Sequence, residues 1–270
     1  MMVTPDSAWL RRFHPDDRDL PTLLCLPHAG GSASSYFALS ARLRGAVDVV
    51  AVQYPGRQDR YVEPAAVAMD ELVDELLEEV RPVAAAGPYA LFGHSMGALV
   101  GYELTLRLER AGDPPPRWLF ASGRRAPSRL RTDDHLHARP EEELVRHVLT
   151  LGGIQPQVLA DPDLRAMIVP VLRADFTVVE TYRPEPGRRI GCPVSVLVGD
   201  RDPVVHREEA MAWREHTRGA FELTSFVGGH FYLTDYVPEL ARTVLDRFLP
   251  AAAARRRPAR AGATPPGPRS

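Results

Sequence analysis

The stretch that decides the fold is Tyr89-Ala90-Leu91-Phe92-Gly93-His94-Ser95-Met96-Gly97. It opens with a short apolar run and closes where a helix-like apolar periodicity begins, which continues to Arg110. Between the two lies a G-x-S-x-G pattern, the signature of a nucleophile elbow, in which a serine sits on a sharp turn from a strand into a helix. Such a turn pushes the hydroxyl out above a sheet, and its glycines let neighbouring backbone approach closely. We therefore predict a strand, a strained turn that presents Ser95 as a nucleophile, and a helix.

The same alternation of strand and helix continues on both sides of the elbow. Short apolar runs bounded by glycine or proline alternate with segments in which apolar residues recur every three to four positions. The predicted strands are residues 22–26, 47–53, 89–92, 118–121, 193–198 and 221–226, and the predicted helices are residues 68–86, 95–110, 207–217 and 233–249. Strand-then-helix repetition predicts an α/β fold, with a mostly parallel sheet and helices on both faces.

One region, residues 124–189, breaks the alternation because it contains helix patterns but no strand. One helix is expected to start at Pro140 and another at Asp161, the second running towards Tyr182 with a kink near Pro170. An insertion of this length is too long for an ordinary loop, so we expect a helical lid over the site.

We expect the chain to form a single domain over residues 1–249 that includes this lid. Residues 250–270 are rich in Ala, Arg, Pro and Gly and show no apolar periodicity, so they are expected to form a disordered tail.

Composition excludes several classes of function. The chain has 270 residues and a net charge of −2, which argues against nucleic-acid or anionic-membrane binding. All 33 basic residues are arginines, so lysine Schiff-base chemistry is excluded. Cys25 and Cys192 lie in or beside apolar runs and are expected to be buried thiols. Neither a signal peptide nor an 18-residue apolar run is visible, so we expect a cytoplasmic protein without a membrane anchor.

A serine nucleophile needs a base, and the chain offers nine histidines. His230 follows the strand 221–226 on a Gly-Gly loop, where it can reach the serine, and is the predicted base. His206 and His216 are expected on or near a largely solvated helix. His28 and His94 lie beside the site.

The acid that orients the base is expected after the preceding strand, 193–198, where two aspartates compete. Asp202 lies further past the strand end and is preferred, whereas Asp200 could cap the turn or pair with Arg201.

A second acidic pair suggests a different chemistry. Asp133 and Asp134 stand next to His135 and His137 and could suggest a metal site. Their polar surroundings favour a solvated loop, so no metal is expected.

A tetrahedral intermediate also needs hydrogen-bond donors for its oxyanion. The backbone N–H of Met96, directly after the serine, is one candidate, and the N–H of Ala29 in the glycine-containing loop 27–32 is the other. This loop lacks the spacing of a phosphate-binding motif.

Five motifs together resemble the type II thioesterases, which are stand-alone α/β-hydrolases. They are Leu26-Pro27-His28-Ala29-Gly30-Gly31-Ser32-Ala33, Tyr54-Pro55-Gly56-Arg57, Gly93-His94-Ser95-Met96-Gly97, Gly199-Asp200-Arg201-Asp202-Pro203 and Gly228-Gly229-His230-Phe231. The resemblance covers residues 15–249. It implies an α/β-hydrolase fold, a Ser95–His230–Asp202 triad, an oxyanion hole from the Ala29 and Met96 backbones, and a lid at 124–189.

The resemblance also implies a function. Such a protein hydrolyses acyl thioesters on the phosphopantetheine arm of acyl or peptidyl carrier proteins, and so edits stalled chains in polyketide or non-ribosomal peptide biosynthesis. It implies a monomer without a cofactor. The alternatives are a chain-releasing fatty-acyl thioesterase, a carboxylester hydrolase and, more remotely, a non-catalytic carrier-protein-binding module. The basic cluster Arg124, Arg125, Arg129 and Arg131 is a candidate docking patch for an acidic carrier protein, the alternative being that these arginines only solvate a loop.

Overall fold

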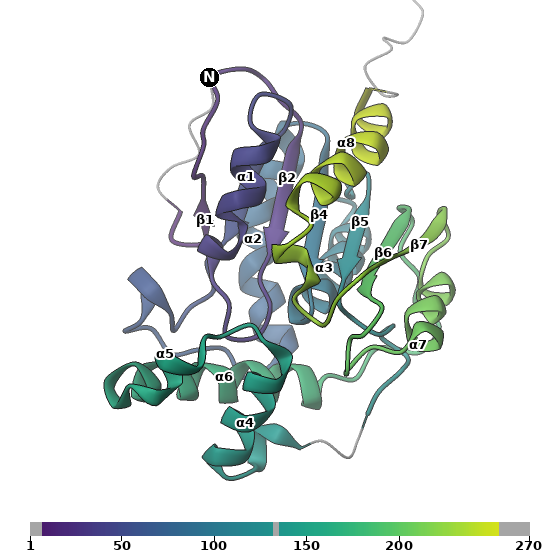
Figure 1. Cartoon of the computed structure of the whole chain (residues 1–270). Helices are drawn as coiled ribbons and strands as arrows, with labels where there is room; N and C mark the ends of the chain where they lie inside the picture. The colour runs from purple at the N-terminus through teal and green to yellow at the C-terminus, as the bar shows by residue number, and fades with distance from the viewer. Residues whose placement is uncertain (1–6, 132–134, 254–270) are drawn as a thin grey trace, which may run out of the picture.

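A seven-stranded sheet forms the centre of the structure, a computed structural model that describes residues 7–131 and 135–253 (Figure 1). The strands lie in the order β1-β3-β2-β4-β5-β6-β7 and pair in parallel, except that β1 is antiparallel to β3. Their bounds are β1 (Leu10–Arg11), β2 (Thr22–Leu26), β3 (Asp48–Val52), β4 (Tyr89–His94), β5 (Leu119–Ser122), β6 (Val194–Gly199) and β7 (Phe221–Phe226). The predicted mostly parallel sheet is confirmed. The two-residue strand β1 was not predicted, because so short a segment shows no alternation.

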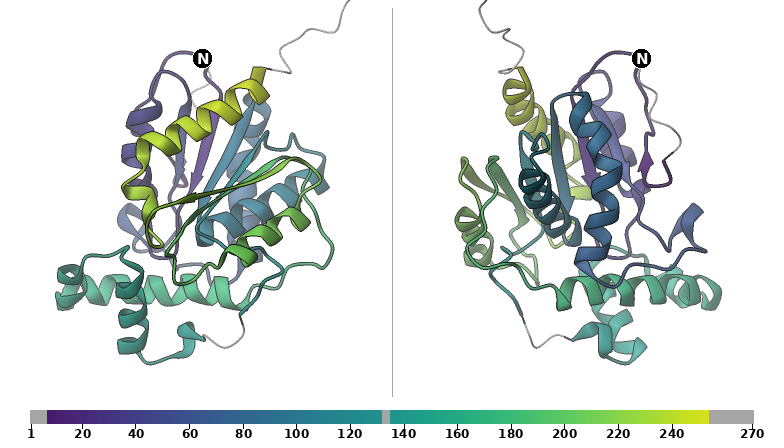
Figure 2. Two further views of the ribbon diagram at one scale, coloured as in Figure 1. Left: turned by 45° about the vertical axis from the view of Figure 1, so that its right-hand side comes forward. Right: turned by 180° about the vertical axis from the view of Figure 1, so that it is seen from behind.

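Helices cover both faces of the sheet (Figure 2). Their bounds are α1 (Phe37–Leu43), α2 (Met69–Ala86), α3 (Met96–Ala111), α7 (Arg207–Met211) and α8 (Val237–Ala253). Successive strand residues alternate between two apolar clusters: Leu24 and Leu91 pack with α2 and α3, whereas Leu23 and Phe92 pack with α1 and α8. Because both faces are buried, the strands read as continuous apolar runs rather than alternating ones.

Three helical segments differ from the expectation. Helix α1, preceded by a 3-10 turn at Ala33–Tyr36, was not predicted. The helix expected at 207–217 is split into α7 and a 3-10 segment, Ala212–His216. Helix α8 begins four residues later than expected, after another 3-10 turn, and its backbone remains helical through Ala253. The tail expected from residue 250 therefore starts inside a helix, and residues 254–270 lie outside the described part of the chain.

A group of helices inserted between β5 and β6 forms the predicted lid. It consists of α4 (Glu141–Leu151), α5 (Pro156–Ala160) and α6 (Pro162–Thr181), and in all views it lies at one end of the sheet (Figures 1 and 2). The lid has an apolar cluster of its own, which includes Leu144, Val148, Leu159, Val169 and Leu172. Helix α6 continues unbroken through Pro170, and the short α5 was not predicted.

Within residues 7–131 and 135–253, no helix is both long and apolar enough to cross a bilayer. Cys25 and Cys192 are buried free thiols, as predicted.

Candidate active site

Ser95 occupies the turn between β4 and α3 with φ 53° and ψ −112°, a conformation that non-glycine residues rarely adopt. The flanking glycines are required by close backbone contacts rather than by their own dihedral angles. A Cβ on Gly93 would lie 2.1 Å from the carbonyl oxygen of Gly97, and a Cβ on Gly97 would lie 2.0 Å from that of Leu26. The G-x-S-x-G pattern therefore folds into a strained elbow, as predicted.

His230 and Asp202 form a buried hydrogen bond. The Nδ1 of His230 lies 2.7 Å from Oδ2 of Asp202, and the side chains are 3% and 0% exposed. The other carboxylate oxygen accepts the backbone N–H of Val204 at 2.9 Å. With Nδ1–H donated to the aspartate, the Nε2 of a neutral imidazole is left as an acceptor.

The serine and the histidine share one pocket. Ser95, His230 and Ala29 all line it. Among the described residues, the Ser95 hydroxyl forms no hydrogen bond with the His230 ring. Ligand-free active sites often show such loose catalytic contacts, which tighten only when substrate is bound.

Asp200 has a different environment from Asp202. Its Oδ1 accepts the backbone N–H of Gly228 at 2.9 Å and lies 3.6 Å from Nε of Arg201. Of the two competing aspartates, Asp202 is therefore the one that contacts His230. Asp200 instead stabilises the loop that carries the histidine.

The lid supplies most of the apolar wall of the pocket. Its apolar lining residues are Leu136, Val148, Leu151, Ile154, Phe176 and Val179 from the lid, with Val204, Val205 and Phe231 from the core. The lid and the core are in contact at Gly153, where even a Cβ atom would be too close. Such a Cβ would lie 2.2 Å from the ring of Phe231, the residue after His230. This apolar wall suits an acyl chain attached to a reactive carbonyl, and the same pocket is also lined by polar residues, among them Arg131, His147 and Glu180.

Two further histidines lie near His230, His94 in contact with it and His28 in contact with His94, and burial keeps both neutral. The ring of His94 lies 5.0 Å from that of His230 and 5.7 Å from that of His28, centroid to centroid. Burial, followed by repulsion from His230, lowers the pKa of His28 to about 3 and that of His94 well below its ordinary value. Both rings therefore stay neutral near neutral pH.

One sequence expectation about a polar residue outside the triad was wrong. His216 is buried rather than solvated, and its Nε2 shares a hydrogen bond of 2.8 Å with the hydroxyl of Ser128. The four clustered arginines do not form one surface patch. Arg124, Arg125 and Arg131 line the pocket, where Arg131 also pairs with Glu209, whereas Arg129 pairs with Glu215.

The acidic pair Asp133 and Asp134 lies outside the described residues. The described ranges hold no group of three or more His, Cys, Asp or Glu side chains that could bind a metal ion.

Sequence reasoning missed a buried ion pair beside the oxyanion loop. Arg57 and Asp175 form two hydrogen bonds, of 2.7 and 2.9 Å, and their side chains are 7% and 3% exposed. In the sequence, Arg57 stands out only as the last residue of the motif 54–57, and nothing there indicates an ionic partner. Asp175 gave no signal, because a single acid in an amphipathic helix normally faces solvent.

A parallel sheet with a serine elbow after its central strand and a helical lid between β5 and β6 defines an α/β-hydrolase. A family profile for the thioesterase domain matches residues 21–248. The chain belongs to the thioesterase family, as the motifs indicated, and is a thioester hydrolase.

Individual relatives agree with this assignment. The chain is 43% identical to a probable cadicidin biosynthesis thioesterase of Streptomyces griseus, over 91% of this chain and 69% of the relative. It is 41% identical to thioesterase PikA5 of Streptomyces venezuelae, over 90% and 86%. Among solved structures, the type II thioesterase BorB from the borrelidin biosynthetic cluster superposes with a TM-score of 0.84 and 44% identity, covering 91% of this chain and all of BorB.

Proposed function

We propose that this enzyme hydrolyses acyl thioesters on the phosphopantetheine arm of acyl or peptidyl carrier proteins and thereby removes stalled or aberrant acyl groups. The observation that carries the proposal is the buried His230–Asp202 pair beside the same lid-walled pocket that Ser95 lines. The relatives support the choice of substrate. BorB is described as a type II thioesterase from a biosynthetic cluster, and YbtT, 26% identical with a TM-score of 0.82, as a type II thioesterase of an NRPS/PKS pathway.

In the first half-reaction Ser95 is acylated. The Nε2 of His230 takes the hydroxyl proton as the Ser95 oxygen attacks the thioester carbonyl, while Asp202 stabilises the imidazolium. The backbone N–H groups of Ala29 and Met96 donate hydrogen bonds to the oxyanion. The C–S bond then breaks, and the imidazolium returns its proton to the departing pantetheine thiolate.

In the second half-reaction the acyl-serine is hydrolysed. His230 accepts a proton from a water molecule, whose oxygen attacks the ester carbonyl, and then protonates the Ser95 oxygen as it leaves. The products are the free acid and the restored enzyme. No step needs a cofactor or a metal ion. The apolar lid wall holds the acyl chain and keeps bulk water from the intermediate.

The proposal places the enzyme in the cytoplasm as a monomer. The buried free thiols Cys25 and Cys192 are in keeping with a reducing compartment. Sedimentation analysis over a range of protein concentrations tests the monomer, and a concentration-dependent dimer would contradict it.

The experiment that tests the function is a hydrolysis panel. It compares acyl groups on a carrier protein, the same groups on N-acetylcysteamine, and the corresponding oxygen esters. We expect carrier-bound thioesters to have the highest kcat/KM and Ser95→Ala to lower turnover by roughly 10⁶-fold without unfolding the protein. Preference for oxygen esters would favour a carboxylester hydrolase. Turnover of Ser95→Ala within tenfold of the parent would remove Ser95 from the mechanism.

A further inference from the structure

We propose that Asp175, on the lid helix α6, is a positioning residue for the oxyanion loop, residues 27–32. This inference rests on the proposed function, because it assigns the loop's Ala29 N–H to the oxyanion. Asp175 touches no reacting atom. It holds the neighbouring peptide of the loop, so that the lid forms part of the oxyanion hole's support as well as a wall of the acyl pocket.

Asp175 and its partner Arg57 both form hydrogen bonds with the backbone of the oxyanion loop. Its Oδ2 accepts the backbone N–H of Gly30 at 2.7 Å and a hydrogen bond from Arg57 at the same distance, while Oδ1 accepts a second one from Arg57 at 2.9 Å. Arg57 in turn donates to the carbonyl oxygen of Gly31 at 3.2 Å. One buried ion pair therefore holds the loop at two consecutive residues, Gly30 and Gly31.

Apolar packing fixes the same point. Gly30 has φ +75°, and a Cβ there would lie 2.4 Å from Cδ2 of Leu172. Leu172 and Asp175 are three positions apart on α6 and thus share one helix face. Only glycine combines this backbone conformation with so close an approach of the helix.

Consecutive loop residues face opposite sides. Ala29 lines the pocket of Ser95 and His230, whereas Gly30 lines a second cavity with Val171 and Ala174 of α6. Holding the Gly30 N–H from the lid side therefore sets the orientation of the Ala29 peptide on the pocket side.

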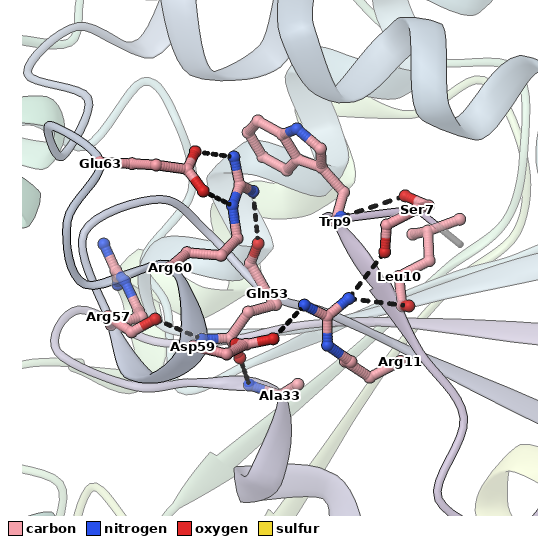
Figure 3. Close-up of polar contacts among 10 residues, drawn as sticks. All are labelled: Ser7, Trp9, Leu10, Arg11, Ala33, Gln53, Arg57, Asp59, Arg60 and Glu63. Atoms are coloured by element: carbon pink, nitrogen blue, oxygen red, sulfur yellow. Dashed lines mark hydrogen bonds and ion pairs between the residues drawn. The ribbon is translucent and has the colours of Figure 1, made fainter. Parts of the chain in front are cut away.

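A polar network attaches Arg57 to the core (Figure 3). Gln53, at the end of β3, accepts the N–H of Ala33 through Oε1 at 2.9 Å and donates from Nε2 to the carbonyl oxygen of Arg57 at 3.0 Å. Arg60 donates to the carbonyl oxygen of Gln53 at 2.9 Å and lies 4.4 Å above the ring of Trp9. The loop that carries Arg57 and the end of the oxyanion loop are thus joined at Gln53.

We expect the Arg57–Asp175 ion pair to affect the rate of the reaction more than the stability of the fold. A buried ion pair contributes little net stability, because desolvation offsets its Coulombic attraction, but it can specify one geometry. An oxyanion donor must lie at about 2.7–3.1 Å from the developing charge, so a small shift of the loop weakens the transition-state contact more than substrate binding.

The test uses four variants and two readouts. Asp175→Leu should lower kcat on an acyl-N-acetylcysteamine about 10- to 100-fold and leave KM within about twofold. Affinity for a trifluoromethyl ketone analogue of the substrate, whose serine adduct carries the oxyanion, should fall by the same factor as kcat/KM. Asp175→Asn should lose less, because its amide oxygen can still accept the Gly30 N–H.

Two further variants separate positioning from stability. Tyr182→Phe removes a hydrogen bond of 2.6 Å to Glu103 at the C-terminal end of α6, so it loosens the same helix without touching the loop. Its kcat should stay within about twofold of the parent. The double variant Arg57→Leu with Asp175→Leu removes the buried charge imbalance and should fold, yet keep the low kcat, because the Gly30 N–H remains unheld.

Three outcomes would overturn the inference. They are parent-like kcat in Asp175→Leu, an equal loss in Tyr182→Phe, and recovery of kcat in the double variant. Each is distinct from failure of the proposed function, in which the parent enzyme itself would not hydrolyse the thioester.

Discussion

At the scale of single residues, the site holds one histidine that is paired with a carboxylate and two buried histidines that stay neutral. His28 and His94 lie in ring contact with each other, and His94 contacts His230. Only His230 has a carboxylate partner among these three, Asp202 at 2.7 Å. Burial without such a partner lowers the pKa of the other two, so the stability of the fold should depend on pH.

The first prediction concerns the pH dependence of stability. The pKa of His28 is about 3 in the folded chain and about 6.5 when unfolded, so between these values the unfolded chain binds more protons. The free energy of unfolding should therefore fall as pH drops below about 6.5. His28→Asn should reduce the loss between pH 7 and pH 5 by up to about 2 kcal/mol, measured by urea unfolding. An unchanged pH dependence in the variant would contradict a buried neutral His28.

The second prediction separates the two aspartates. Asp202→Asn removes the carboxylate that orients His230 and should lower kcat roughly 10⁴-fold, because the imidazole is held in the wrong tautomer. Asp200→Asn keeps an oxygen for the Gly228 N–H and should change kcat less than about tenfold. Steady-state kinetics at one pH compares the two, and a reversed order would assign the triad to Asp200.

At the scale of elements, the lid helix α6 has an N-terminus that is well capped. Asp161 accepts the backbone N–H groups of Asp163 and Leu164 at 2.9 and 3.0 Å, and Pro162 occupies the first turn. The sequence predicted this start, because an acid before a proline is a common helix signal. The cap matters here because α6 also carries Asp175.

The third prediction follows from this cap. Asp161→Ala should destabilise the start of α6 by about 1 kcal/mol and speed amide exchange in its first turn. Asp163→Ala, which removes only a first-turn charge, is the matched control and should cost a few tenths of a kcal/mol. Hydrogen exchange followed by mass spectrometry measures the amide protection of the first turn in both variants. Equal protection in the parent and in Asp161→Ala would show that packing alone stabilises the start of the helix.

At the scale of the whole molecule, the basic cluster Arg124, Arg125, Arg129 and Arg131 offers little exposed charge to a carrier protein. Of the basic cluster, Arg124, Arg125 and Arg131 line the pocket, and Arg129 is the most exposed member, paired with Glu215 at 3.4 Å. Arg247 is its counterpart on α8, about equally exposed and paired with Glu222. Charges of this kind act mainly on the association rate.

The fourth prediction compares these two arginines. Arg129→Gln should lower kcat/KM about two- to fivefold for an acyl-carrier protein at low salt and leave the same acyl group on N-acetylcysteamine unaffected. The effect should shrink at physiological ionic strength, where the Debye length is about 8 Å. Arg247→Gln should change neither substrate. An equal effect of the two variants would remove the lid side as the docking face.

The features that the sequence alone determined are those whose physical cause is local. Six strands follow from short buried runs, and the elbow follows from glycines that stand two positions on either side of Ser95. The lid was visible because its helix signals interrupt the strand pattern. The positions of His230 and Asp202 were predictable because the carboxyl ends of parallel strands converge on one edge. Their catalytic roles stay predictions until the variants are measured.

Only the tertiary structure decided the contacts between distant segments. Asp175 lies 118 positions from Arg57 and 145 from Gly30, and nothing in its own helix distinguishes it from a solvated acid. The burial of His216 and the inward place of Arg124 likewise depend on which elements pack over them. Local periodicity predicts which face of a helix is apolar. It does not predict which polar side chain meets a buried partner, because that depends on how the lid settles on the sheet.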